Sequence, residues 1–264
     1  MEQFKIRASS ASSIVAGEIG LTDTQRKKMI QLQNKDNITA KQNEELLKLV
    51  DKHENPQISK GAKTTCEHWV RNKMYQRRKE AYSKYFDKGN IMEDSSIENT
   101  AEILDLGMIF KNEEYFEDEF FCGTPDIILA DEVIDMKNPW DFTTFPVFDI
   151  GIPNMDYYWQ LQVYMHLTGK KKARLIYYLS DTPESLIESE AWYHCKKLGM
   201  DEVDPDILAA YTAKMTYDDI PKELKIKIFE VEYSHQDVQL LQDRVKLCRK
   251  YIKELWENQD YSER

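Results

Sequence analysis

The sequence is short of the features that mark membrane-inserted and secreted proteins. Its longest apolar runs fall well below the ~20 residues that a membrane-spanning helix requires. The opening segment MEQFKIRASSASSIV has no apolar stretch behind a basic start, so we expect no signal peptide. With 264 residues, of which 41% are hydrophobic and 31% charged, the chain is expected to be a soluble, cytoplasmic protein with a sizeable core and no membrane partner.

Cysteine and histidine are too scattered to suggest a disulfide framework or a metal cluster. The four cysteines form no CxxC pair and stand far apart, at Cys66, Cys122, Cys195 and Cys248. This spacing is typical of free thiols in a reducing compartment and disfavours both zinc and iron–sulfur sites. The five histidines show no ligand spacing either.

The net charge of −11 argues at first sight against a nucleic-acid partner, but the charges are unevenly distributed. Residues 60–88 carry nine Lys or Arg against three acids, whereas residues 93–119 carry ten acids against the single Lys111. A protein that contacts phosphates with one surface and holds cations with another would show this pattern. Two solvated helix faces would show it as well, and charge alone favours this simpler explanation.

The N-terminal part is expected to be helical. Residues 1–20 suggest a short strand and a Ser-rich turn, and residues 21–54 are polar and helix-prone, with Thr22 and Thr39 as N-caps. A helix is predicted over 61–86, with Lys88-Gly89 as its stop signal, and another from about Ile91 to Leu106.

The central part then changes to strand periodicity. Two β-rich segments, 120–129 and 133–137, flank a turn at 130–132 and predict a hairpin. A proline-containing loop follows, and the remaining segments predict a helix over 156–168 ending at Gly169, a strand over 172–180, a partly helical acidic region over 181–222, a strand over 225–234 and a helix over 236–257.

These elements indicate an α/β (α+β) fold in which helices flank a central mixed sheet. We expect one domain over residues 1–264. Its parts are a helical N-terminal region (1–88), a core (89–180), a region that reads as an insertion (181–224) and a C-terminal strand and helix (225–264).

Three charged residues fall inside the predicted hairpin, within the stretch FCGTPDIILADEVIDMKNPW (residues 121–140). Residues two apart on a strand share a face, so Asp135 and Lys137 project together, and a suitable register brings Asp126 to the same patch. Two carboxylates without a nearby arginine suit a hard divalent cation such as Mg²⁺ or Mn²⁺. A lysine beside that cation can orient an attacking water or help to deprotonate it. A plain ion-pair cluster explains the same pattern, which also occurs by chance.

Two other segments offer supporting side chains. Glu93, in GNIMEDSSIE (residues 89–98), would bring a further carboxylate on a helix, although acids near a helix N-terminus are common for electrostatic reasons alone. Gln160 and Tyr164 are four apart and share one helical face, from which they can contact a carboxylate or a phosphate. By itself, that helix is better explained as a mixed polar and core helix.

Taken in order along the chain, four motifs resemble the PD-(D/E)XK nuclease superfamily. They are GxxxE (Gly89 to Glu93), PD (Pro125-Asp126), DxK (Asp135 to Lys137) and QxxxY (Gln160 to Tyr164). The chain is most similar to the lambda-exonuclease-like, YqaJ-type viral recombinase branch, because IRASSASSIV (6–15) and KNPWDFTTFP (137–146) resemble that family's segments too. The resemblance covers about residues 5–180 and implies a restriction-endonuclease-like sheet flanked by helices.

The resemblance implies a role for each matching residue. Asp126 and Asp135 would bind the metal, Lys137 would be the catalytic lysine, and Glu93 would be the helix-borne acid of the site and a further metal ligand. Gln160 and Tyr164 would form the auxiliary motif of the catalytic site. Relatives have one more acid before the PD motif, for which Glu117, Asp118 and Glu119 are all candidates.

The predicted DNA contacts lie in the N-terminal part. Arg7 and Ser10 would lie where the family contacts the DNA end. The basic block adds candidates for the DNA backbone: Arg71, Lys73, Arg77 and Arg78.

The resemblance also implies a Mg²⁺- or Mn²⁺-dependent 5′→3′ exonuclease that acts on linear double-stranded DNA and leaves 3′ single strands for phage-type recombination. It further implies a ring-shaped homotrimer that cooperates with a single-strand annealing protein. Two alternatives stay open: a related endonuclease of the repair, restriction or CRISPR-adaptation type, and a non-catalytic DNA-binding module of the same fold. Intact Asp126, Asp135 and Lys137 count against the module, which has no chemical need for them.

Overall fold

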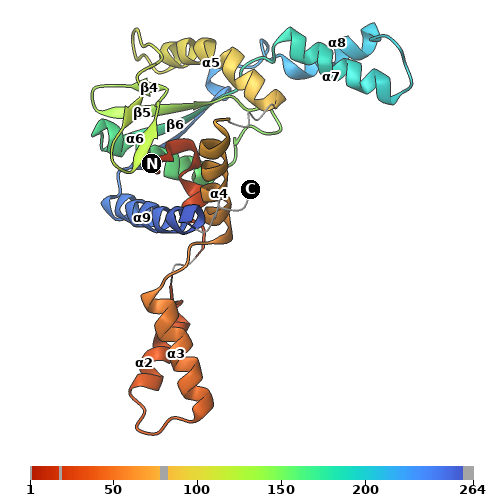
Figure 1. The fold of residues 1–264 in the computed structure, drawn as a ribbon. Helices are drawn as coiled ribbons and strands as arrows, with labels where there is room; N and C mark the ends of the chain where they lie inside the picture. Colours follow the sequence, from red (N-terminus) through yellow and green to blue (C-terminus); the bar gives the residue numbers. More distant parts are fainter. Residues whose placement is uncertain (1, 18–19, 78–82, 258–264) are drawn as a thin grey trace. The chain divides into compact units, whose positions relative to one another are not determined.

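The structure is a computed structural model that describes residues 2–17, 20–77 and 83–257 (Figure 1). The chain divides into two compact units. The helical unit comprises residues 1–79, 119–121 and 235–264, and the sheet unit comprises residues 80–118 and 122–234. The expectation of a single nuclease domain stays a prediction. Among the described residues, no helix has the length and apolar character needed to cross a membrane.

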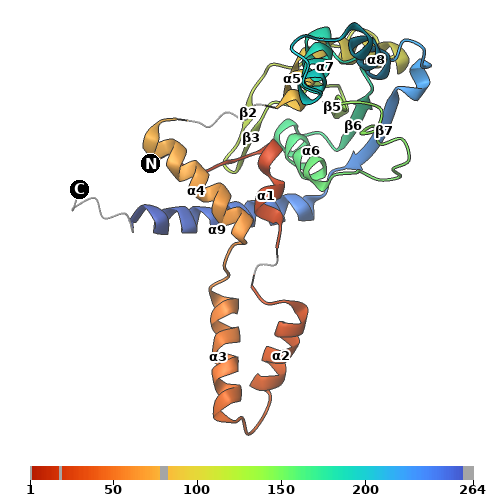
Figure 2. The ribbon, with the colours of Figure 1, turned by 90° about the vertical axis from the view of Figure 1, so that its right-hand side faces the viewer.

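The helical unit follows the predicted pattern closely. Its elements are β1 (Ile6–Arg7), the 3₁₀ helix η1 (Ala8–Ser10), α1 (Ser12–Val15), α2 (Asp23–Gln33), α3 (Ala40–Glu54), α4 (Lys60–Tyr75) and α9 (His235–Glu257). Thr22 and Thr39 cap α2 and α3 as predicted, each accepting a hydrogen bond from the backbone N–H of a glutamine three residues on. α2 and α3 lie side by side (Figure 2) and share a small apolar cluster. All four cysteines are free and buried, which confirms the thiol prediction.

One predicted helix boundary is wrong. α4 ends at Tyr75, where Gln76 adopts a left-handed conformation with φ 49°, and α5 runs over Lys84–Ile103 straight through Lys88-Gly89. The expected stop signal therefore lies inside a helix. The Lys88 side chain is fully buried, and its bonds to other segments stabilise the helix at this point. Tertiary contacts of this kind override local helix propensity.

The sheet unit contains the predicted mixed sheet. Its elements after α5 are β2 (Phe116–Glu117), β3 (Phe121–Gly123), β4 (Ile127–Ile128), β5 (Glu132–Lys137), α6 (Met155–Thr168), β6 (Lys172–Tyr178), α7 (Glu184–Lys197), α8 (Pro205–Met215), the 3₁₀ helix η2 (Lys222–Leu224) and β7 (Ile226–Glu232). β2 and β3 pair antiparallel. The main sheet has the order β4-β5-β6-β7, in which β5 and β6 are parallel and the other pairs antiparallel. The fold class is confirmed, and the region 181–224 is a pair of packed helices, α7 and α8, followed by η2.

The two faces of the main sheet are covered by different helices. α5 packs on one face, where Ile97 joins an apolar cluster with Ile134 and Met136 of β5. α6 packs on the other face (Figure 1). Asp135 and Lys137 project towards α6, where they contact Gln160 and Tyr157. Because side chains alternate along β5, a single strand supplies both the core on one side and the charged residues on the other.

Candidate active site

Asp126 and Asp135 meet at the open end of the hairpin. Ile127 pairs with Ile134, and continuing this register by one residue sets Asp126 opposite Asp135. Asp126 Oδ2 also accepts a hydrogen bond of 2.7 Å from the backbone N–H of Met136. The hairpin register therefore brings the two carboxylates together, as the sequence predicts.

Lys137 lies on the same side of β5 as Asp135. Its Nζ is 2.5 Å from Asp135 Oδ2, so the ammonium group and this oxygen form a close ion pair. Asp135 is 1% exposed, and apart from this ion pair Oδ2 accepts no hydrogen bond from any described residue. The ammonium group also lies 4.8 Å from the ring centroid of Tyr157 at the start of α6. Asp135 therefore has a buried oxygen with unused bonding capacity.

The electrostatics of the cluster favour a bound cation. Burial, and then the charge of Asp135, raise the pKa of Asp126 to about 7, although Lys137 and the Met136 N–H act in the opposite direction. Burial on its own would lower the pKa of Lys137, but Asp135 and Asp126 outweigh it and raise that pKa. Two carboxylates thus share one ammonium group in a poorly hydrated place, which leaves an excess of negative charge.

Gln160 and Tyr164 reach this cluster from α6. Gln160 Nε2 donates to Asp135 Oδ1 at 3.1 Å and to the hydroxyl of Tyr164 at 3.0 Å. Burial, and then Asp135, raise the pKa of the Tyr164 phenol, so it stays protonated. The predicted auxiliary motif therefore orients one oxygen of Asp135 and leaves its other oxygen for another partner.

Glu93 lies at the edge of the cluster and has a partner of its own. It is close enough to Asp126 to raise the pKa of that residue slightly, yet its Oε2 accepts a hydrogen bond of 2.7 Å from Lys111. In the ranges that the structure describes, no three His, Cys, Asp or Glu side chains are arranged as a metal cluster. In the sequence, Lys111 is marked only as the single base in an acidic stretch.

The residues present fit one hard divalent cation. Asp126 and Asp135 both offer carboxylate oxygens, and Asp135 Oδ2, which is buried with Lys137 as its ion-pair partner, could accept a cation as a second partner. Mg²⁺ keeps several water ligands in such sites, which accommodates the small number of protein ligands. Asp126 and Asp135 would hold the ion.

A buried network fixes the segment that follows Lys137. Lys88 Nζ donates to the carbonyls of Trp140 at 2.9 Å and Ser180 at 2.8 Å, and burial lowers its pKa to about 8. Asn138 accepts hydrogen bonds from the hydroxyls of Ser96 and Ser180. These contacts tie α5, the loop after β5 and the end of β6 together around the site. Sequence reasoning missed all of them, because each joins residues far apart in the chain.

Two of the three candidates for a further acid have partners other than Asp126 and Asp135. Asp118 contacts His166 at 2.9 Å, and Glu119 pairs with Arg249 in the helical unit. Glu117 lies on β2 and is exposed. Asn112, just before these acids, does contact Asp126: its backbone N–H donates to the Asp126 carbonyl at 2.7 Å.

The predicted DNA-contacting residues lie in the helical unit. Arg7, Arg71, Lys73 and Arg77 are exposed, Ser10 is half-buried, and Arg78 lies outside the described residues. Arg71 pairs with Glu67 at 3.2 Å, and Lys73 pairs with Glu2 while lying 5.6 Å from the ring centroid of Trp69. α4 therefore presents cationic side chains to solvent. Their role in DNA binding stays a prediction.

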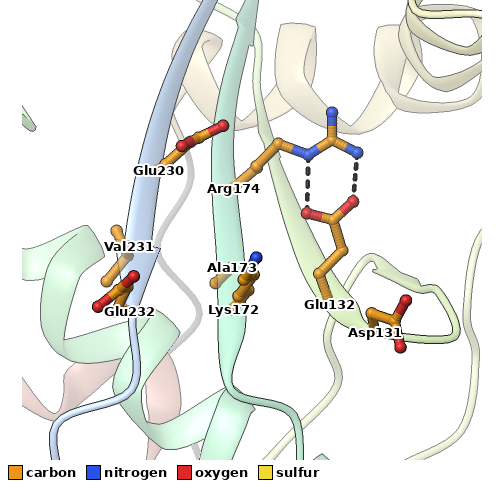
Figure 3. A pocket seen from close by; sticks show the side chains of 8 residues that line it. All are labelled: Asp131, Glu132, Lys172, Ala173, Arg174, Glu230, Val231 and Glu232. Carbon is orange, nitrogen blue, oxygen red and sulfur yellow. Dashed lines mark hydrogen bonds and ion pairs between the residues drawn. The ribbon is translucent and has the colours of Figure 1, made fainter.

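A second acid–base pair occupies the opposite face of the sheet. There Glu132 of β5 and Arg174 of β6 form a two-pronged ion pair in a shallow charged groove (Figure 3). Lys172, Glu230 and Glu232 line the same groove.

Comparison with solved structures places the whole chain in a known fold. A phage-related exonuclease from Haemophilus somnus 129PT superposes with a TM-score of 0.69 at 19% identity, covering 98% of both chains. The alkaline exonuclease from Laribacter hongkongensis superposes with a TM-score of 0.57 at 11% identity over 96% of this chain and 90% of that one, and its complex with dAMP with a TM-score of 0.56. The chain shares its fold with exonucleases. No protein-family model matches the sequence, and neither does any curated protein.

Proposed function

We propose that the protein is a metal-dependent deoxyribonuclease that hydrolyses phosphodiester bonds. The observation that carries this proposal is the convergence of Asp126, Asp135 and Lys137, with a buried Asp135 oxygen that, apart from its ion pair with Lys137, accepts no hydrogen bond from the described residues. Lys137 is the single ammonium group that balances the charges of these two carboxylates. The fold shared with exonucleases supports the same conclusion.

Each residue has a definite task in the proposed reaction. A Mg²⁺ or Mn²⁺ ion held by Asp126 and Asp135 would polarise the phosphoryl oxygen and lower the pKa of a bound water. Lys137, whose pKa is raised, donates hydrogen bonds that orient the attacking water and stabilises the negative charge that develops on the phosphate. Gln160 holds the Asp135 carboxylate in place through its bond to Oδ1.

The substrate and assembly are proposed from the family resemblance. The enzyme would act as an exonuclease on ends of linear double-stranded DNA, in the 5′→3′ direction, and leave 3′ single strands for recombination. It would work in the cytoplasm as a homotrimer with an annealing protein as partner. The dAMP complex of the Laribacter enzyme supports a nucleotide as product.

End-labelled linear and circular duplexes test the proposal. With Mg²⁺ present, we expect nucleotides to be released from linear DNA only, and EDTA to stop the reaction. Cutting of circles would instead identify an endonuclease, and binding without cleavage would identify a non-catalytic module. Substrates labelled on one strand end at a time determine the polarity.

A further inference from the structure

We propose that Lys111 supplies a fixed positive charge beside the active site, so that the site holds one divalent cation, at Asp126 and Asp135, and not two. The inference rests on the proposed nuclease function. It concerns how many ions the site takes and which residue provides the remaining charge.

The position of Lys111 is fixed by its neighbours. Asn112, the next residue, donates from its backbone N–H to the Asp126 carbonyl at 2.7 Å and from its side chain to the Pro125 carbonyl at 2.9 Å. These two bonds hold the segment against Pro125 and Asp126, the two residues just before β4. Lys111 Nζ then lies 2.7 Å from Glu93 Oε2 on α5. The backbone next to Lys111 is therefore held in place, and its ammonium group is paired with Glu93 while 41% of the Lys111 side chain is exposed.

The surroundings of Lys111 are those of a cation site. Its hydrogen bond to Glu93 raises its pKa most, and the charges of Asp94 and Asp126 add to that effect. The Glu93 side chain is only 19% exposed, so its carboxylate has limited access to water and depends on Lys111. The ammonium group therefore lies among the carboxylates of Glu93, Asp94 and Asp126 and supplies part of the positive charge that a second cation would supply.

A second divalent cation would need Glu93 as a ligand together with Asp126. The Glu93 oxygen that would bind it is already bonded to Lys111, and a further ion would bring two positive charges close together. The described residues also offer no third acid, histidine or cysteine in metal-binding geometry. The simplest arrangement is one ion between Asp126 and Asp135 and an ammonium group beside it. Glu93 then orients Lys111 and does not bind the metal.

Titration with Mn²⁺ in the absence of DNA tests the inference, with bound ions counted by electron paramagnetic resonance. For the full chain we expect one Mn²⁺ per chain. Lys111→Gln, which frees Glu93, is expected to bind a second Mn²⁺ more weakly. Adding Glu93→Gln to that variant should return the count to one. Lys222→Gln is the matched control, because Lys222 pairs with Glu102, also on α5; its count should stay at one.

Two results would overturn the inference while leaving the proposed function intact. One is a pair of ions bound by the wild-type chain, and the other is an unchanged count in folded Lys111→Gln. If that variant does not fold, Glu93→Gln alone decides: an unchanged count and affinity supports the inference, and a weakened first site contradicts it. If the proposed function itself is wrong, the result differs: Asp126→Asn would bind as much Mn²⁺ as the wild-type chain.

Discussion

Strand β5 carries two acid–base pairs, one on each face of the sheet, and they are built differently. Glu132 meets Arg174, whose Nε donates at 2.9 Å to one carboxylate oxygen while Nη2 donates to the other (Figure 3). The planar guanidinium group matches the carboxylate, so both oxygens have a partner. We call this pair closed, because Arg174 donates a hydrogen bond to each carboxylate oxygen of Glu132.

We call the pair formed by Asp135 and Lys137 open, because the single ammonium group of Lys137 faces more than one carboxylate. The lysine ammonium group is a compact charge that cannot donate two parallel hydrogen bonds as a guanidinium group does. Here two carboxylates share it. Apart from this ion pair, Asp135 Oδ2 accepts no hydrogen bond from the described residues, and Asp126 keeps a raised pKa. Since a buried carboxylate left in this state is costly, the open pair indicates a place for a cation, whereas the closed pair needs none.

Replacing the base of each pair should give opposite results. Lys137→Ala is expected to lower the rate of DNA hydrolysis by roughly 10²- to 10⁴-fold, because the water and the developing charge lose their partner. Arg174→Ala should leave that rate within about twofold and lower the free energy of unfolding by about 1–2 kcal/mol, since Glu132 loses its partner. Initial rates on linear duplex and urea unfolding measure the two effects.

Circular dichroism must show that Lys137→Ala is folded for the comparison to count. A fully active Lys137→Ala protein would remove the proposed mechanism. Loss of activity in Arg174→Ala, with the fold intact, would show that the closed pair also takes part in the reaction.

Asp126 should control stability when no metal is present. Its pKa rises from 3.8 in the unfolded chain to about 7 in the folded one, so the folded state binds the proton more tightly. Relative to Asp126→Asn, the wild-type protein should therefore lose stability as the pH rises from about 4 to 7 and change little above that. In EDTA at pH 8, the variant should be more stable by on the order of 1–3 kcal/mol.

Adding Mg²⁺ should reverse this order. The cation stabilises the wild-type protein through the ionised carboxylate, and thermal unfolding with and without Mg²⁺ measures that gain. Asp126→Asn should show little gain. If both proteins gain equally, the ion binds elsewhere.

The sequence could predict the open pair because its geometry is local. Asp135 and Lys137 share a face by the two-residue period of a strand, and a short turn sets Asp126 opposite them. Gln160 and Tyr164 follow from helical spacing in the same way. The motif order then indicated that these local pieces belong to one site.

What surrounds the pair could not be predicted, because it depends on contacts between distant segments. Lys88 reads as part of a helix stop, yet it is buried by contacts with Trp140 and Ser180, 52 and 92 residues away. In the sequence Lys111 is an isolated base, whereas in the structure it pairs with Glu93, 18 residues earlier in the chain. No local pattern distinguishes such lysines from exposed ones.

Lys88 is a buried lysine that differs from Lys137 in its partners, because its ammonium group donates to two backbone carbonyls. Lys88→Met should lower the free energy of unfolding by about 1–3 kcal/mol, because the carbonyls of Trp140 and Ser180 lose their donor. The effect should depend on pH. The folded-state pKa is about 8 against 10.5 in the unfolded chain, so the cost of the buried charge is fully present below pH 8 and is relieved as the pH rises towards 10.5.

The wild-type protein should therefore gain stability relative to Lys88→Met between pH 8 and 10. Lys84→Met, one helical turn earlier, is the matched control because Lys84 is partly exposed and paired with Glu190. It should change stability by at most about 1 kcal/mol at any pH. Equal effects of the two variants would mean that burial of Lys88 is not what distinguishes it.

The smallest effect is expected from the hydroxyl of Tyr164, which lies behind the open pair. Tyr164→Phe removes the group that accepts one of the two Gln160 hydrogen bonds, while the bond from Gln160 to Asp135 Oδ1 remains. Losing one neutral hydrogen bond is worth about 1 kcal/mol, so we expect a three- to tenfold lower rate with a small increase in the Mg²⁺ concentration needed. Tyr178→Phe, in the apolar cluster on the opposite face, should leave both unchanged. If the two variants behaved alike, α6 would only pack against the sheet and Gln160 would not orient Asp135.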